Sequence, residues 1–194
     1  MSIRAIIGAA LMSILAACAS EPAPVAPVKV APDLSLTLPR LNDLGRRVEA
    51  SQMLIAHYGE QSYPFEGRLS ATPERFLMVG LDPMGRELLR ITWTPGGVEY
   101  SAAPWVPNSM RPENILVDIV LLYWPEDVVR AMLVRAGATL ESGPRSRSIL
   151  AGGREVMRAD YQPVSGDSPW TGRLHYSNLA WGYSLDIQTV ETRP

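Results

Sequence analysis

The sequence predicts an α+β fold in which about nine or ten short, mostly antiparallel strands surround one helical insertion. Short runs rich in β-branched and aromatic residues recur at the spacing of a meander. Turn-like sequences such as Asp82-Pro83-Met84-Gly85 and Gly152-Gly153 separate them. The stretch from Pro112 to Ala136 carries helical signals instead. The two helices that it predicts therefore lie between two groups of strands.

The first 17 residues are typical of an export signal. Arg4 precedes the apolar run Ala5–Leu15, which is well short of the ~20 residues that a membrane-spanning helix needs. The run ends in Leu15-Ala16-Ala17-Cys18, which resembles the lipobox of bacterial lipoproteins. That resemblance implies cleavage before Cys18 and a diacylglyceryl group on its sulfur. The alternative is an ordinary secretory signal with an incidental cysteine.

The residue after Cys18 indicates which membrane holds the expected anchor. In Gram-negative lipoproteins an Asp at this place commonly signals retention at the inner membrane, and here Ala19 follows instead. The resemblance therefore implies the periplasmic face of the outer membrane. Each buried methylene of an acyl chain adds ~0.8 kcal/mol, so two or three chains hold a protein there durably. Cys18 is the only cysteine, which excludes a disulfide within one chain.

We expect three parts in the chain: a signal over residues 1–17, a lipidated and proline-rich tether over 18–40, and one domain over 41–194. Glu21–Pro39 holds five prolines among alanines and valines. This composition favours polyproline II, at ~3.1 Å per residue, and predicts a semi-rigid spacer. The rest has the length and the ordinary composition, 46% hydrophobic and 20% charged, of one globular domain.

The periodicity of the domain predicts its elements in order. Leu41–Ala50 has apolar residues on one helical face and predicts a short amphipathic helix. The expected strands are Ser51–Tyr58, Phe65–Ser70, Arg75–Leu81, Arg86–Thr94, Val98–Ser101, Thr139–Glu141, Ser146–Leu150, Glu155–Gln162, Thr171–Ser177 and Tyr183–Val190.

The helical insertion begins at Pro112, a residue favoured in the first helical position. The following turns are apolar nearly all round except for Asp118, which predicts a helix buried on more than one face. Pro125 ends this helix and begins another, and Gly137 is a plausible stop for the second. The apolar stripe of the second helix is formed by Val128, Val129, Met132 and Leu133.

The order of elements resembles the LolA/LolB class of lipoprotein carriers. The segments Val79–Gly85 and Leu116–Pro125 are similar to two motifs of a small family of outer-membrane lipoproteins, some of them encoded beside aryl polyene biosynthesis genes. This resemblance implies a half-open antiparallel barrel with helices covering its concave side. It also implies a lipid or an acylated protein as cargo and a LolA-like periplasmic carrier as partner. The protruding loop with an exposed Leu that the outer-membrane acceptor uses has no counterpart that aligns here.

A half-open barrel lined by apolar side chains would offer acyl chains a concave site, with the two helices as a lid. The residues expected to line it are Leu116, Ile119, Val120, Leu122, Trp124, Val129 and Leu133. The alternative is that the same side chains fill a solid core.

Two further features of the sequence are open to a functional interpretation. The loop with Trp105, Val106 and Met110 could touch a bilayer or a partner, or Trp105 could fold back and plug the end of the barrel. Asp118 could pair with an arginine such as Arg86 or Arg90, face solvent, or contact a polar headgroup. We expect Trp105 to be the plug, and we expect Asp118 to form a structural ion pair or to face solvent.

Other classes of function have little support. The net charge of −2 and the lack of a basic run argue against nucleic acid. We expect no enzyme, metal or cofactor, because His57 and His175 show no metal-ligand spacing and no Gly-x-Ser-x-Gly motif appears. A hydrolase triad assembled in space is the less favoured alternative. Its criterion is a serine and an acid within hydrogen-bond reach of one histidine, and we expect neither histidine to have both.

The sequence therefore predicts an outer-membrane lipoprotein that binds a lipid or acylated cargo without chemistry. Cargo of this kind includes a lipoprotein or an aryl polyene-type lipid. The alternative is a structural or assembly lipoprotein of an envelope complex, which a filled core with a large exposed apolar patch would favour.

Overall fold

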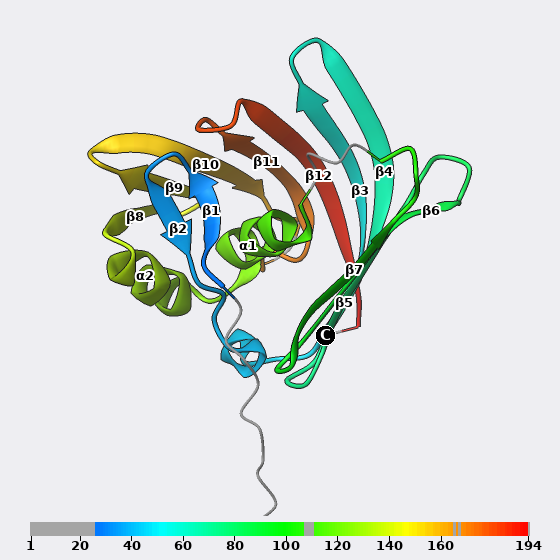
Figure 1. The fold of residues 1–194 in the computed structure, drawn as a ribbon, viewed down its shortest axis with the longest axis horizontal. Helices are drawn as coiled ribbons and strands as arrows, with labels where there is room; N and C mark the ends of the chain where they lie inside the picture. Colours follow the sequence, from blue (N-terminus) through cyan, green and yellow to red (C-terminus); the bar gives the residue numbers. More distant parts are fainter. Residues whose placement is uncertain (1–25, 107–110, 165, 167, 194) are drawn as a thin grey trace, which may run out of the picture.

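The computed structural model describes residues 26–106, 111–164, 166 and 168–193. Most of them form one antiparallel sheet of ten strands, which Figure 1 shows to be strongly curved. In spatial order the strands are β7 (Gly97–Ala102), β6 (Glu87–Thr94), β5 (Phe76–Leu81), β4 (Gln61–Ala71), β3 (Val48–Tyr58), β12 (Tyr183–Arg193), β11 (Gly172–Asn178), β10 (Arg154–Gln162), β9 (Ser146–Ala151) and β8 (Ala138–Gly143). The prediction of a curved, antiparallel α+β fold is confirmed.

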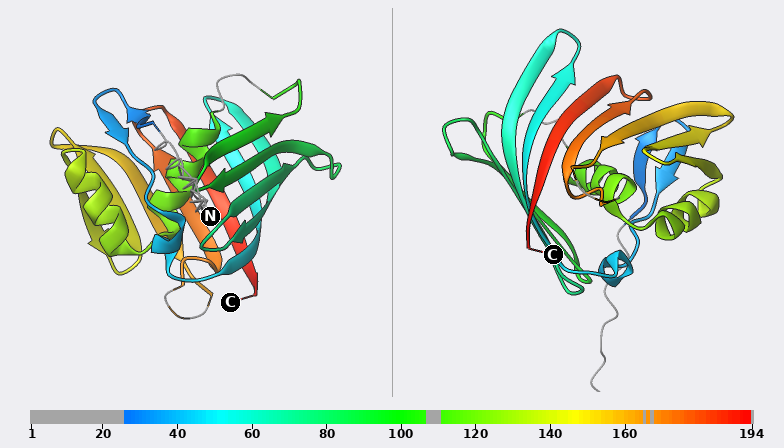
Figure 2. Two further views of the ribbon diagram at one scale, coloured as in Figure 1. Left: turned by 60° about the horizontal axis from the view of Figure 1, so that its bottom comes forward. Right: turned by 180° about the vertical axis from the view of Figure 1, so that it is seen from behind.

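The sheet consists of two meanders joined at its centre. β3 to β7 follow one another on one side, β8 to β12 on the other, and β12 pairs with β3 from Tyr183↔Tyr58 onward. The first and last strands of this order, β7 and β8, do not pair with each other, so the sheet does not close into a barrel. Both views in Figure 2 show this open, trough-like form.

Two helices connect the edge strands β7 and β8. α1 (Pro112–Tyr123) lies in the concave side of the sheet, and α2 (Glu126–Arg135) follows beside β8 (Figure 1). Pro112 is the first residue of α1, and Pro125 precedes α2, as the sequence predicts. Every residue of α1 from Leu116 to Tyr123 is buried, because the sheet curves around the helix. The described part of the chain contains no helix with the length and apolar character needed to cross a membrane.

The predicted spacer is wrong for residues 28–39, because this segment belongs to the folded domain. β1 (Val28–Ala31) and β2 (Leu34–Leu36) form a hairpin whose alternate side chains are buried in the core. Asn114 of α1 donates a hydrogen bond to the backbone oxygen of Lys29 at 3.2 Å. Pro32 lies in the turn, where the missing N–H breaks no ladder bond. The folded domain therefore begins near Val28 and not at residue 41.

The predicted helix Leu41–Ala50 is also mostly absent. Only Leu41–Leu44 form a short 3-10 helix, and Gly45 ends it with a positive φ of 75°. β3 begins at Val48, opposite Ala71 of β4. The apolar side chains that suggest one helical face belong instead to a turn and to the alternating core face of a strand. The signal and Cys18 lie outside the described residues.

Candidate functional site

The seven residues expected to line a ligand cavity lie in the packed centre of the domain. None of them is more than 7% exposed. The Trp124 ring lies near Trp93 of β6 and Phe76 of β5, with centroid separations of 6.1 and 6.4 Å. None of the seven lines either of the two surface hollows described below. In this structure they form a core that joins α1 and α2 to the sheet.

An exposed apolar surface lies farther along the same concave face, toward the tip of the β3–β4 hairpin. Gln52 of β3 donates to the Tyr123 hydroxyl of α1 at 2.8 Å, which places the even-numbered residues of β3 on the face that carries α1. Leu54 of β3 is buried. Ala56, the next residue of β3 on this face, lies between Tyr63 of β4 and Leu185 of β12, and Tyr63 is 48% exposed. Exposure therefore rises steadily toward the tip.

The outermost part of this concave face has no charged side chain on its three central strands. We call it the tip surface, and it consists of Ala56, Tyr58, Tyr63, Phe65, Tyr183 and Leu185. The exposed apolar residues on the convex face differ in their surroundings. Ile55 lies opposite Asp186, and Met53 lies opposite Glu66, so each has an acidic neighbour. A continuous apolar area is thus a property of the concave side.

Exposed apolar residues also occur in the connections at this end of the sheet. Alternate strands of an antiparallel sheet run the same way, so β3, β5, β7 and β11 all end at this edge. The following turns carry Met84, which is 80% exposed, Trp105, Leu179 and Trp181. The Arg86 guanidinium carbon lies 5.2 Å from the centre of the Trp105 ring.

Trp105 does not plug the sheet, since its side chain is 57% exposed. Its expected folding back is therefore wrong, and stacking against Arg86 gives the physical reason. Val106 is half-buried. Met110 lies outside the described residues, so its expected contact with a membrane or partner stays a prediction.

Within the described part of the chain, Asp118 has two tyrosine partners and no arginine partner. The Tyr176 hydroxyl of β11 donates to Asp118 Oδ1 at 2.6 Å, and the Tyr183 hydroxyl of β12 donates to Oδ2. The two arginines considered as partners pair elsewhere, Arg86 with Asp82 and Arg90 with Glu87. The expected arginine pair and the solvent-facing position are therefore both wrong, because Asp118 is buried and accepts hydrogen bonds from two tyrosines. Together the three side chains form a tyrosine–carboxylate cluster that attaches α1 to the sheet.

Burial determines the electrostatics of this cluster. Loss of solvent raises the pKa of the Asp118 carboxyl to about 6, although the hydrogen bonds from Tyr176 and Tyr183 act in the opposite direction. Burial likewise raises the pKa of both tyrosines well above the usual value. Asn178 donates to the Tyr183 hydroxyl at 3.3 Å, so the cluster extends to the turn beside the tip surface. Sequence reasoning found Asp118 but not the tyrosines, because nothing in the local pattern pairs positions 58 and 65 residues apart.

A second polar cluster lies on the convex face of the same strands. Asp186 accepts a hydrogen bond from His175 Nδ1 at 2.7 Å and from His57 Nε2 at 2.9 Å. The other ring nitrogens face serines, Ser177 Oγ at 3.2 Å from His175 and Ser62 Oγ at 2.9 Å from His57. Both histidines thus have a serine and an acid within reach. Our expectation that neither would have both is wrong.

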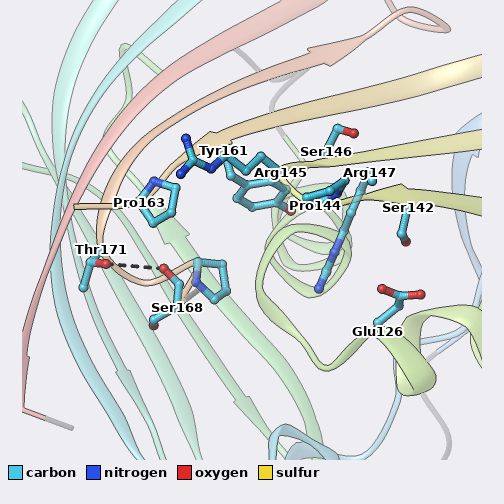
Figure 3. A pocket seen from close by; sticks show the side chains of 12 residues that line it. Glu126, Ser142, Pro144, Arg145, Ser146, Arg147, Tyr161, Pro163, Ser168 and Thr171 are labelled. Atoms are coloured by element: carbon cyan, nitrogen blue, oxygen red, sulfur yellow. Dashed lines mark hydrogen bonds between the residues drawn. The ribbon is translucent and has the colours of Figure 1, made fainter. Parts of the chain in front are cut away.

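A hollow of about 200 Å³ lies between the β8–β9 turn, the start of α2 and the segment before β11 (Figure 3). Two of its charged side chains, Arg147 and Glu126, form hydrogen bonds within the protein. Arg147 donates to the backbone oxygens of Leu121 and Trp124, at 2.9 and 3.0 Å. Glu126 accepts from Arg130, which lowers the pKa of its carboxyl. The hollow is therefore better explained as a junction that holds the helices than as a ligand site.

Replacing Arg147 by Met is expected to lower the free energy of unfolding by about 2 kcal/mol. α1 has no basic residue in its own last turn, so Arg147 supplies the positive charge at its C-terminal carbonyls. Chemical denaturation followed by circular dichroism measures the loss. Arg154→Met removes an exposed arginine from the neighbouring strand and is the matched control. Equal stabilities of the two variants would contradict this role.

The class that this geometry defines is an open, strongly curved antiparallel sheet folded around a buried helix. The chain belongs to the family described as "Protein of unknown function (DUF3261)", whose model matches residues 49–191. No curated protein matches the chain. Its likeness to the LolA/LolB carriers and to aryl polyene-associated lipoproteins therefore stays a prediction. Among the described residues, no group of three or more His, Cys, Asp or Glu side chains is arranged to hold a metal ion.

Proposed function

We propose that this protein is an outer-membrane lipoprotein, anchored through Cys18, that binds the acyl part of a lipid or acylated protein on its tip surface. The observation that carries the proposal is the rise in exposure of apolar side chains along the concave face, from buried Leu54 to Tyr63 and Tyr58. The bound acyl chain would cover the exposed apolar side chains next to the buried core of the domain. No reaction is part of this function.

The chemistry of the tip surface suits such a ligand. Burying apolar area contributes about 25 cal/mol per Å², so covering a few hundred Å² provides several kcal/mol before the cost of association. Aromatic side chains such as Tyr58 and Tyr63 give large contact areas and lose little conformational freedom. In this proposal a LolA-like carrier presents the acyl chain at the open end, where Trp105 and Trp181 are also exposed.

Photo-crosslinking in the native host tests the proposal. Cells would receive a fatty acid that carries a diazirine and an alkyne, and peptide mapping of the purified protein would locate the adducts. We expect adducts on β3, β4 or β12 at the tip surface. Tyr63→Glu should lower their yield roughly tenfold, because it places a charge in the site and costs about 1.4 kcal/mol or more of binding.

Ile55→Gln is the matched control for this experiment. Ile55 lies on the same hairpin and is 42% exposed, but it faces the convex side beside Asp186. The acyl groups incorporated at Cys18 would be counted separately by mapping the N-terminal peptide. Uniform labelling of both faces, or equal labelling of the two variants, would exclude the tip surface as an acyl site.

A second candidate function is an assembly lipoprotein that uses the same end of the sheet to hold a protein partner. The filled core favours it, because Leu116, Leu122 and Leu133 leave no room for a ligand beneath α1. In the crosslinking experiment this function predicts no acyl adduct at the tip surface. A diazirine amino acid incorporated at Tyr58 would then crosslink to one envelope protein, and it would not do so when placed at Ile55.

A further inference from the structure

The polar cluster on the convex face spans four neighbouring strands. His57 of β3 lies directly opposite Ser62 of β4 on one side and Ser184 of β12 on the other. Ser177 of β11 lies opposite Ser184 from the far side, and the next pair of these two strands on the same face is His175↔Asp186. Strand alternation places all these side chains on the face away from α1. These polar side chains thus lie on the opposite face of the sheet from the tip surface, and a role for them does not depend on the acyl-binding proposal.

The hydrogen bonds assign a role to each nitrogen of the His175 ring. Asp186 accepts from Nδ1 at 2.7 Å, so the proton of the neutral ring lies on that nitrogen. Nε2 then presents its lone pair to Ser177 Oγ at 3.2 Å. Hydrogen bonds from His175 and His57 lower the pKa of the Asp186 carboxyl and keep it ionised at neutral pH. An ionised acid, an oriented base and a hydroxyl within reach form the arrangement of a nucleophilic serine site.

Two observations favour Ser177 over Ser62 as the nucleophile. Ser177 lines a hollow of about 300 Å³, together with His57, Leu179 and Ser184, whereas Ser62 does not line it. His175 and Asp186 lie next to this hollow, behind Ser177, and are not part of its wall. Ser184 lies directly across from Ser177 in the strand register, so its hydroxyl can donate to an oxygen atom bound there. Leu179 gives one wall an apolar character that suits a short acyl or aryl group, and Tyr183 of the tip surface borders the hollow at its edge.

We propose that Ser177, His175 and Asp186 form a site that hydrolyses esters of short acyl or aryl acids, with Ser184 as the donor to the carbonyl oxygen. Ser177 Oγ attacks the ester carbonyl carbon as its proton moves to His175 Nε2. The bond to the alcohol oxygen breaks, and the alcohol leaves with the proton from His175. A water molecule then attacks the acyl-serine, giving its proton to His175, and Ser177 recovers a proton as the carboxylic acid is released.

Covalent labelling of the full-length chain in detergent tests the site. A fluorophosphonate probe forms a bond from phosphorus to the serine oxygen and releases fluoride, and intact-mass spectrometry counts the adducts. We expect one adduct, which peptide mapping places on Ser177. Ser177→Ala should carry none, and Asp186→Asn should react at least about 100-fold more slowly because His175 loses its orientation. Circular dichroism would check that the substitutions at half-buried Ser177 and exposed Asp186 leave the fold intact.

Ser62→Ala is the matched control. It removes the serine that faces His57, the second histidine hydrogen-bonded to Asp186. Its labelling rate should equal that of the unmodified protein. Hydrolysis of p-nitrophenyl butyrate should show the same order of variants, with a lower kcat in Ser184→Ala. An unlabelled protein, an adduct on Ser62, or equal rates in Ser177→Ala would overturn the assignment.

Discussion

Replacing Trp124 by Ala should lower the free energy of unfolding by about 3–5 kcal/mol, the largest effect expected of any single core change in this protein. Trp124 is 1% exposed, and its ring packs against those of Phe76 and Trp93, which lie side by side on β5 and β6. It also marks the break between α1 and α2, so its loss opens a cavity where both helices meet the sheet. Surroundings drawn from several elements collapse poorly around a cavity of that size.

Urea denaturation of Trp124→Ala, with Trp124→Phe as the control, separates the two contributions of the side chain. The indole N–H is buried without a hydrogen-bond partner among the described residues. Phenylalanine keeps the aromatic contacts and removes this unpaired group, so we expect a loss of only about 1–2 kcal/mol. If the phenylalanine variant lost as much stability as the alanine variant, packing around Phe76 and Trp93 would not be the source.

The second large effect concerns Asp118 and has a defined direction with pH. The pKa of this carboxyl is about 6 in the folded protein, raised by burial from the 3.8 of a free side chain. Between these values the folded state binds more protons than the unfolded state. The stability that Asp118 contributes is therefore fully present below the lower value and is lost as pH rises through the higher one. The full change is about 3 kcal/mol.

Asp118→Asn isolates this titration, because the amide keeps the shape of the side chain and does not ionise. We would measure the free energy of unfolding of both proteins from acidic to neutral pH. The difference, unmodified protein minus variant, should fall by about 3 kcal/mol over that range. Subtraction cancels the contributions of all other ionisable groups, which both proteins share. A difference that does not change with pH would mean that Asp118 is not buried between Tyr176 and Tyr183 in solution.

The structure also decides which variants can test ligand binding. Leu116 and Leu122 stand out in the sequence as apolar residues beside a candidate cavity, but they are no more than 2% exposed. A charge placed there would unfold the domain, and the loss of binding would carry no information about a ligand. Tyr63 and Ile55 suit the purpose because both are partly exposed and lie on opposite faces of one hairpin.

Local patterns in the sequence predicted the elements of this fold well. Turns such as Asp82–Gly85, alternation along β3 to β12, and the prolines at positions 112 and 125 depend on residues close together in the chain. The same local reasoning failed at Val28–Leu36. There proline content indicated a spacer, whereas alternate apolar side chains form a hairpin that is stable only when packed against α1.

The sequence by itself determined that the chain is one strand-rich domain with a buried helical insertion, and it carries the lipobox-like segment that predicts an anchor. Only the tertiary structure decided that the core beneath α1 is filled and that the apolar surface lies at the tip of the β3–β4 hairpin. It also brought Asp118 to two tyrosines, and His175 to Ser177 and Asp186. The physical reason is that these contacts depend on how far the sheet curves and on the register of β11 against β12. The curvature and the register arise from packing across the whole domain, so they cannot be predicted from a local pattern of residues.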